Sequence, residues 1–321
     1  MTGWLVTGAS GMLGRDLVGV LGRLGEDVTG LRRADLDVTD EPAVRALILR
    51  VRPAVVVNCA AWTAVDDAEA REDEALLVNG RGASNVAAAC AASGARLVHV
   101  STDYVFGGDG RAPYAEYDGT APRTAYGRTK LAGEQAVLGL LPETGYVVRT
   151  AWLYGAHGPN FVRAMIGLAG RQPFVDVVAD QRGQPTWAAD VADQIVALTR
   201  AAPRAGVYHA TSSGEATWYE LALEVFRLLG ADPARVRATT SAAFPRPAPR
   251  PAYSVLGHDR HADAGVEPIG DWRTALSRAW PVLSRAWPVL AAAGPVLAAA
   301  GLASQAAQPG GVSQAVGVPG E

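Results

Sequence analysis

The segment Gly3-Trp4-Leu5-Val6-Thr7-Gly8-Ala9-Ser10-Gly11-Met12-Leu13-Gly14 determines the fold expected for this chain. Its first half is mostly apolar and typical of a buried strand, and a helical pattern runs from Leu13 to about Leu24. Glycines between a strand and a helix let the backbone approach a pyrophosphate at the helix N-terminus. The spacing here is Gly-x-x-Gly-x-x-Gly, and it predicts a dinucleotide-binding turn at the start of an α/β domain.

Further apolar runs extend this unit into a sheet. Ala54–Cys59 is predicted as a continuous apolar strand, of the kind that marks parallel strands covered on both faces, and Ala95–Val100 is the next predicted strand. Helices are predicted over 41–51, 69–78, 83–92, 189–200 and 218–229. We therefore predict an α/β fold, a Rossmann-type doubly wound parallel sheet with a smaller, interleaved C-terminal substrate lobe. The predicted divisions are 1–150 for the dinucleotide-binding domain, with 188–211 returning to it, 151–283 for the lobe and 284–321 for a tail.

A second informative stretch is Tyr126-Gly127-Arg128-Thr129-Lys130. Lys130 is the only lysine in 321 residues, against 28 arginines. On a helix, residues four apart share one face, and an ammonium ion there can hold a nicotinamide ribose and make a neighbouring phenol a stronger acid. The same spacing also occurs as a solvated surface pair. The retained lysine favours the first interpretation, in which Tyr126 donates a proton.

Composition limits the classes of partner and compartment. The net charge is −3, with 49% hydrophobic and 19% charged residues, so no basic surface indicates a nucleic-acid partner. Cys59 and Cys90 lack metal-ligand spacing, and two free thiols are typical of a reducing compartment. The apolar run from Val289 to Ala303 is too short for a membrane span, and the first strand leaves no room for a signal peptide. We expect a cytoplasmic protein with no bound metal and no membrane contact.

The end of the second predicted strand bears on the choice of cofactor. Arg32 and Arg33 follow that strand, where arginines suit a 2′-phosphate and an acidic residue suits free ribose hydroxyls. Asp35 and Asp37 come after the arginines. The pattern favours NADPH, with NADH tolerated; the alternative is that both arginines are solvated loop charges.

Several separated motifs carry a resemblance to a known family. They are Gly8-x-x-Gly11-x-x-Gly14, 58–61 (Asn-Cys-Ala-Ala), 101–107 (Ser-Thr-Asp-Tyr-Val-Phe-Gly), Tyr126-x-x-x-Lys130, 149–155, 180–186 and 250–256. Their order and spacing resemble extended short-chain dehydrogenases/reductases. More narrowly, residues 3–283 resemble the dTDP-4-dehydrorhamnose reductases.

The resemblance implies roles for individual residues. Thr102 is expected to hydrogen-bond the substrate carbonyl, Tyr126 to protonate the forming alkoxide, and Lys130 to orient the ribose and tune Tyr126. The cofactor residues implied are Gly8, Gly11, Met12, Leu13, Gly14, Arg32, Arg33, Asp37, Val38, Ala60, Ala61, Tyr126 and Lys130. The substrate residues implied are Thr63, Val65, Thr102, Asp103, Tyr104, Trp152, Asn160, Arg182 and Arg250.

Five positions in that set define the expected chemistry more closely. Related sugar-nucleotide dehydratases have a glutamate where this chain has Tyr104, which implies simple carbonyl reduction here. Trp152 and Val65 are implied to face the sugar ring, although plain core packing is the alternative for Trp152. Arg182 and Arg250 are the expected partners of a diphosphate, because arginine forks match phosphate oxygens.

The resemblance implies reduction of the C4 carbonyl of a dTDP-4-keto-6-deoxyhexose, most simply dTDP-4-dehydro-L-rhamnose to dTDP-L-rhamnose, by NADPH. Two alternatives stay open. One is a reductase of another dTDP-deoxysugar, such as a dTDP-dihydrostreptose synthase, and the other is a non-catalytic NADP-binding regulatory subunit like that of methionine adenosyltransferase. A monomer or a homodimer is expected. Mg²⁺ could bridge subunits through Asp16, Asp66, Asp67 and Glu69, or these acids could simply solvate helix N-termini.

The C-terminal segment departs from the family. Residues 277–283 (Ser-Arg-Ala-Trp-Pro-Val-Leu) recur as 284–290, and prolines stand at 281, 288 and 295. Proline every seven residues opposes a continuous helix, and the remainder is rich in Ala, Gly and Gln. We expect 284–321 to be a mostly disordered extension whose tryptophans either dock on the body or bind a partner.

Overall fold

A six-stranded sheet is the centre of the larger domain in the computed structural model, which describes residues 3–287. Its strand order is β10-β5-β4-β3-β1-β2, and every neighbouring pair is parallel. The strands are β1 (Trp4–Thr7), β2 (Val28–Leu31), β3 (Val55–Asn58), β4 (Arg96–Thr102), β5 (Gly145–Thr150) and β10 (Gly206–His209). This confirms the predicted Rossmann-type parallel sheet.

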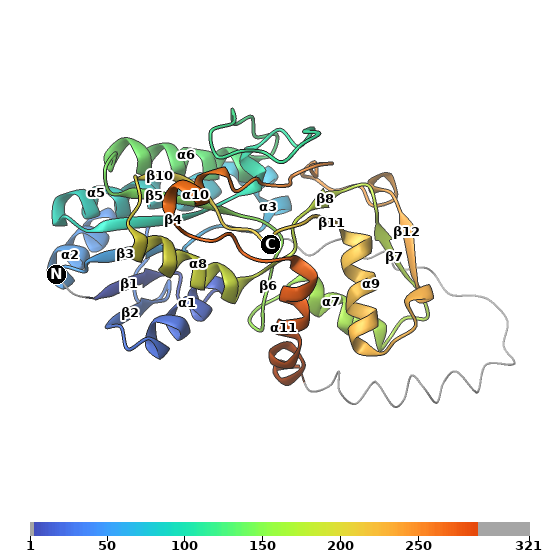
Figure 1. The fold of residues 1–321 in the computed structure, drawn as a ribbon. Coiled ribbons are helices and arrows are strands. Elements are labelled where there is room, and N and C mark those ends of the chain that lie inside the picture. The colour runs from blue at the N-terminus through green and yellow to red at the C-terminus, as the bar shows by residue number, and fades with distance from the viewer. Residues whose placement is uncertain (1–2, 288–321) are drawn as a thin grey trace, which may run out of the picture.

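Helices cover both faces of this sheet, as Figure 1 shows. One layer contains α1 (Met12–Arg23) and α8 (Ala188–Ala201), and the other contains α2 (Glu41–Val51), α5 (Ala83–Ser93) and α6 (Ala125–Leu140). Alternate residues of a strand point to opposite faces. In β1, Val6 packs with the α1/α8 side and Leu5 with the α2/α5/α6 side. Burial on both faces explains why β1 and β3 are almost continuously apolar.

A smaller lobe lies beside the sheet, on the right in Figure 1, and contains α7 (Phe161–Ala169), α9 (Trp218–Leu229), β7 (Val175–Val178) and β12 (Val236–Thr239). Its core joins the two helices to the two strands, which are parallel. Its short elements are β6 (Leu153–Tyr154), β8 (Arg182–Gly183), β9 (Thr186–Trp187), β11 (Ala216–Thr217), η3 (Pro233–Arg235) and η4 (Ser241–Ala243). The short helix α10 (Asp259–Ala264) instead packs on the core of the main sheet through Ala264. The lobe is interleaved with the sheet, because α8 and β10 lie between β9 and β11 in the chain and return to the sheet beside β5.

The helical region after β3 differs from the prediction. The single helix predicted over 69–78 is divided into α3 (Val65–Ala70), α4 (Glu72–Leu76) and a π-helix, η1 (Leu77–Gly82). Arg71 separates α3 from α4 because its backbone is not helical, with φ −135° and ψ 43°. At the other end a Cβ on Gly82 would lie 2.7 Å from Val38, so a glycine is required for the close approach. The short 3-10 turn η2 (Asp103–Val105) follows β4.

The last described helix also departs from the prediction. α11 (Trp272–Ala286) continues through Pro281, although proline lacks the N–H of a helix bond. Ala279 and Leu283, on either side of the proline, are fully buried against the lobe's core, and this packing holds the helix together. Trp280 and Trp287 also pack against that core. The rest of the predicted tail, residues 288–321 with the apolar run 289–303, lies outside the described residues; within 3–287 no helix is long and apolar enough to cross a bilayer.

Candidate active site

A cavity of about 410 Å³ opens at the carboxyl ends of β1, β3, β4 and β5. In parallel α/β sheets this edge is where ligands bind. The lining residues are Ser10, Gly11, Met12, Leu13, Gly14, Cys59, Ala61, Thr63, Val100, Ser101, Thr102, Tyr126, Lys130, Thr150, Ala151, Leu153, Gly158 and Pro159. The structure thus brings the glycine turn and the three predicted catalytic residues to one cavity.

The glycine turn fits a pyrophosphate. Gly8 has φ +67°, and a Cβ there would lie 2.6 Å from the backbone nitrogen of Ala60. A Cβ on Gly14 would collide with the carbonyl oxygen of Gly8. α1 starts after Gly11, which has no side chain to cap the first-turn N–H groups. An uncapped helix N-terminus at a cavity wall is an anion site, so the turn suits the dinucleotide predicted from its sequence.

Tyr126 and Lys130 stand at the start of α6. Thr124 caps this helix by accepting a hydrogen bond from the N–H of Gly127 at 3.0 Å. A Cβ on Gly127 would collide with the carbonyl oxygen of Tyr104, so only glycine lets α6 lie directly on the turn that follows Thr102. This close contact brings Tyr126, which is 8% exposed, to the same cavity as Thr102.

Lys130 is a buried residue and not a solvated surface charge. Its side chain is 2% exposed, and Nζ donates to the carbonyl oxygen of Val100 at 2.7 Å. Burial lowers the pKa of Lys130 to about 8, while the nearby charges of Glu134 and Cys59 act in the opposite direction. Its charge therefore responds to pH close to neutrality, unlike that of an ordinary surface lysine.

Thr102 is held in place by Asp103. The Thr102 hydroxyl donates to Oδ1 of Asp103 at 3.0 Å and accepts from the N–H of Tyr104 at 3.2 Å. Burial raises the pKa of Asp103 to about 6, and the neighbouring hydroxyls of Ser254 and Thr102 oppose this rise. Asp103 was predicted to bind substrate, but it is 1% exposed and is absent from the cavity lining. In this structure it orients Thr102.

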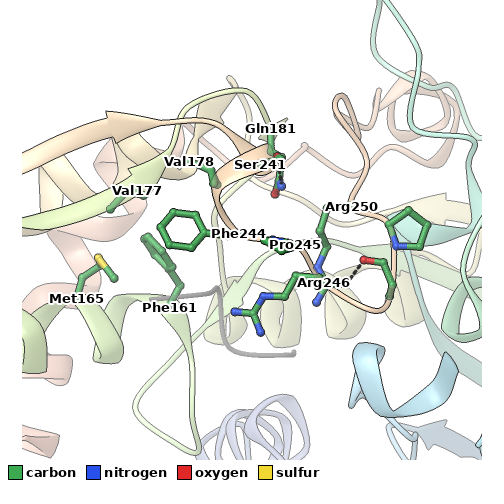
Figure 2. Close-up of a pocket in the computed structure, with 12 residues that line it drawn as sticks. Phe161, Met165, Val177, Val178, Gln181, Ser241, Phe244, Pro245, Arg246 and Arg250 are labelled. Atoms are coloured by element: carbon green, nitrogen blue, oxygen red, sulfur yellow. Dashed lines mark hydrogen bonds between the residues drawn. The ribbon is translucent and has the colours of Figure 1, made fainter. Parts of the chain in front are cut away.

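A separate, smaller cavity lies in the lobe. It encloses about 200 Å³ and is lined at one end by apolar side chains, including Phe161, Phe244 and Met165. Arg246 and Arg250 line the other end, below Gln181 and Ser241, as Figure 2 shows. A third hollow of about 170 Å³ joins Arg250 to Tyr104, whose ring meets the Tyr126 ring edge-on at a centroid distance of 5.6 Å. Arg250 thus lines both the lobe's cavity and the third hollow, and Tyr104 joins that hollow to Tyr126 on α6.

Asp66 holds the arginine segment in place. Its carboxylate accepts from Arg250 at 3.0 Å and from the backbone N–H of Ala248 at 3.2 Å, and Arg246 lies 3.5 Å away. Glu69, also on α3, accepts from the N–H of Ala125 at 2.9 Å. Two of the acids suggested for a subunit cation are therefore engaged inside the chain. Across residues 3–287 no group of three or more His, Cys, Asp or Glu side chains could hold a metal ion.

The predicted 2′-phosphate arginines lie at the surface. The Arg32 side chain is 66% exposed and pairs with Asp35 at 2.8 Å, and that of Arg33 is 82% exposed and lies 3.4 Å from Asp37. Asp37 also accepts from the N–H and hydroxyl of Thr39, so it shapes the turn before α2. Val38 is buried there. The four predicted cofactor residues in this segment, at positions 32, 33, 37 and 38, do not line the large cavity, whose lining on this side ends at the glycine turn.

Four predicted substrate residues do not reach that cavity. Trp152 stacks on Trp218, with ring centroids 3.6 Å apart and planes 6° apart, which supports the core-packing alternative. Val65 is buried beneath Tyr126 with Ala125 and Ala248. Asn160 caps α7 by accepting from the N–H of Arg163 at 3.0 Å. Arg182 pairs with Glu215 at 3.0 Å. In each case a protein partner takes the surface or the polar group that was expected to face the ligand.

Other lining residues were missed from the sequence. Thr150, the last residue of β5, lines the cavity, and within the described chain its buried hydroxyl has no hydrogen-bond partner. The rule that ligands bind at the carboxyl ends of parallel strands could have found it. Phe161, Phe244 and Arg246 of the lobe have no such signal, because segments far apart in the chain assemble that cavity.

Comparison with known proteins gives the family to which this architecture corresponds. The model of the RmlD substrate binding domain matches residues 1–284. A dTDP-4-dehydrorhamnose reductase of Streptomyces griseus is 60% identical over 284 residues, covering 87% of this chain and 93% of the relative. A dTDP-4-keto-6-deoxy-D-glucose reductase of Streptomyces niveus is 59% identical over 280 residues, covering 87% and 97%.

A solved structure shows the same fold. The dTDP-4-dehydrorhamnose reductase of Bacillus anthracis in complex with NADP superimposes with a TM-score of 0.84 at 37% identity. The match covers 87% of this chain and 98% of the bacillus chain.

Proposed function

Because the chain belongs to the RmlD substrate binding domain family, we propose that it reduces the C4 carbonyl of a dTDP-4-keto-6-deoxyhexose with NADPH. The observation that carries this proposal is the meeting of Thr102, Tyr126 and Lys130 with the glycine turn in one cavity. NADPH, when bound, supplies the hydride. The chain's own residues then bind the sugar, orient its carbonyl and provide a proton.

Each catalytic residue has one task in this proposal. The Tyr126 hydroxyl gives its proton to the C4 oxygen as negative charge develops there. Thr102 donates a hydrogen bond to the same oxygen, in exchange for its present partner Asp103. Lys130 holds a ribose hydroxyl of the cofactor and keeps a positive charge near Tyr126. Burial of Lys130 strengthens that charge's effect, because little water screens it.

We propose that the lobe's cavity takes the dTDP portion. Its apolar end, with Phe161 and Phe244, suits a flat thymine ring, and Arg246 and Arg250 suit the diphosphate. In this division, residues 1–150 with 188–211 bind the cofactor and 151–283 bind the sugar nucleotide. The division is supported by β10, which joins the main sheet beside β5 although it follows part of the lobe in the chain.

NADPH is the proposed reductant, with NADH accepted less well. The NADP bound by the bacillus relative and the exposed Arg32 and Arg33 beyond the glycine turn support this preference. We propose a cytoplasmic enzyme, in keeping with the free cysteines Cys59 and Cys90. Sedimentation of the purified chain distinguishes a monomer from a homodimer.

An assay of NADPH oxidation with dTDP-4-dehydro-L-rhamnose, made in situ from dTDP-glucose, tests the function. We expect turnover and dTDP-L-rhamnose as the product. Relatives with two different named activities match at 60% and 59% identity, so the product must be compared with those from other dTDP-ketosugars. Absence of NADPH oxidation with every dTDP-ketosugar contradicts the proposal and favours a non-catalytic binding subunit.

The contacts of Asp66 with Arg250 and with the N–H of Ala248, here called the Asp66 clamp, give a prediction about sugar-nucleotide affinity. Asp66→Asn removes the charge that holds Arg250 and weakens the bond to the N–H of Ala248. Hydrogen bonds to charged groups contribute about 1.5–3 kcal/mol, and about 1.4 kcal/mol corresponds to a factor of ten. We expect KM for the dTDP-ketosugar to rise about tenfold, with kcat and KM for NADPH nearly unchanged, in initial-rate measurements.

Asp67→Asn is the matched control for this prediction. Asp67 is the next residue of α3 and is exposed, so its replacement makes the same change in net charge without touching Arg250. Equal KM values for the two variants contradict the clamp. A lower KM in Asp66→Asn means that the carboxylate competes with the diphosphate, which also contradicts a positioning role.

A further inference from the structure

A row of buried polar side chains crosses the sheet and ends at Lys130. Thr7, Asn58 and His99 lie on the adjacent strands β1, β3 and β4. Thr7 is the register partner of Asn58, and Asn58 is the register partner of His99, so the three side chains stand at one level of the sheet. Each is no more than 1% exposed, and the row is therefore shielded from water.

The hydrogen bonds in this row have a defined direction. Oδ1 of Asn58 accepts from the Thr7 hydroxyl at 2.6 Å and from the backbone N–H of Ala60 at 3.2 Å. A backbone N–H can only donate, so the atom facing it must be the amide oxygen. The amide nitrogen of Asn58 therefore points to His99 Nδ1 at 3.1 Å and donates to it.

This direction determines the tautomer of His99. Burial and the neighbouring Lys130 hold the pKa of His99 well below its ordinary value, so the ring is neutral. A neutral imidazole carries one proton, and Nδ1 is occupied as an acceptor. The proton must then lie on Nε2, which faces Nζ of Lys130 at 3.4 Å.

Two donors cannot bond to each other, and an ammonium ion has no lone pair. A neutral amine does have one and can accept from Nε2–H. We propose that His99 is a positioning residue whose Nε2–H group disfavours the ammonium form of Lys130 relative to the neutral amine, with the tautomer imposed by Thr7 and Asn58. Only the catalytic importance of this effect rests on the proposed function. The charge of Lys130 itself can be measured on the free chain.

Two groups around Lys130, Glu134 and Cys59, oppose this influence in part. Glu134, one turn further along α6, favours the ammonium form, but its carboxylate is shared between Arg149 on β5, at 2.7 and 2.9 Å, and the hydroxyl of Ser101. The remaining facing groups are Cys59, directly after β3, and Tyr126 on α6. The positive charge of Arg149 offsets that of Glu134.

The lone lysine makes the test direct. A chain grown with isotope-labelled lysine gives a single lysine side-chain NMR signal, whose titration reports the pKa of Lys130 without any substrate. His99→Leu removes the facing N–H, and we expect the pKa of Lys130 to rise by about one unit, a tenfold change in proton affinity. His209→Leu is the matched control, because His209 is an equally buried strand histidine on β10, and it should leave the signal unchanged.

The sign of the change decides the proposal. A fall in the pKa of Lys130 means that Nε2 was accepting from the ammonium, and a fall or no change overturns the inference. If His99→Leu does not fold, two-bond ¹H–¹⁵N spectra of histidine-labelled native chain report the tautomer, and protonation at Nδ1 overturns the inference as well. An inactive native enzyme would contradict the proposed function, while these titrations would still decide the role of His99.

Discussion

Tyr126→Phe is expected to lower kcat by about 10²–10⁴-fold, the usual contribution of a positioned proton donor. Tyr126 and Lys130 line the same cavity, where the Tyr126 phenol is the proposed acid, and phenylalanine keeps the ring but has no proton to give. The aromatic contact with Tyr104 and the packing on Val65 survive, so the fold should be retained. Steady-state rates with the dTDP-ketosugar measure the loss, and NADPH binding by fluorescence should be nearly unchanged.

Tyr146→Phe is the control for that experiment. Tyr146 is also buried, but it lies on β5, and its hydroxyl donates to the carbonyl oxygen of Pro203 outside the cavity. Its replacement makes the same chemical change away from the proposed chemistry. Activity in Tyr126→Phe within tenfold of that in Tyr146→Phe contradicts the assignment of Tyr126 as the proton donor.

Lys130→Met should lower kcat/KM by about 10²-fold, the effect of losing roughly 3 kcal/mol of charge-assisted interaction. Methionine matches the length and apolar stem of the lysine, so the buried space between α6 and β4 stays filled while the charge disappears. NADPH should bind more weakly, because the ribose loses a donor. Lys130→Arg should not restore activity, since the larger guanidinium has no room at a site that is 2% exposed.

The same residue sets the pH dependence. The pKa of Lys130, lowered by burial to about 8, means that the ammonium form dominates below pH 8 and the neutral amine above it. Since only the ammonium supports Tyr126, kcat/KM of the native enzyme should fall as the pH rises through about 8. Lys130→Met should lack this decline, and a decline of the same size in that variant would assign it to another group.

Local patterns in the chain were sufficient for the frame of the enzyme. The strand, glycine turn and helix of residues 3–14 follow from hydrophobic periodicity and from the freedom of glycine backbone, both properties of a short segment. The pairing of Tyr126 with Lys130 likewise follows from the pitch of α6. The helix through Pro281 was missed for the complementary reason: proline disfavours a helix locally, and burial of Leu283 outweighs that preference.

Long-range contacts could not be read in this way. The hydrogen bond between Asp66 and Arg250 joins residues 184 positions apart, and those of Asn58 with Thr7 and His99 span 51 and 41 positions. Periodicity assigns each residue to a strand, helix or loop, but it does not say which residue a carboxylate or an amide will meet. Only packing of the strands and of the lobe brings these groups together. The sequence thus predicted the fold class and placed Tyr126 and Lys130 on one helix face, and the three-dimensional arrangement established which polar groups lie around them.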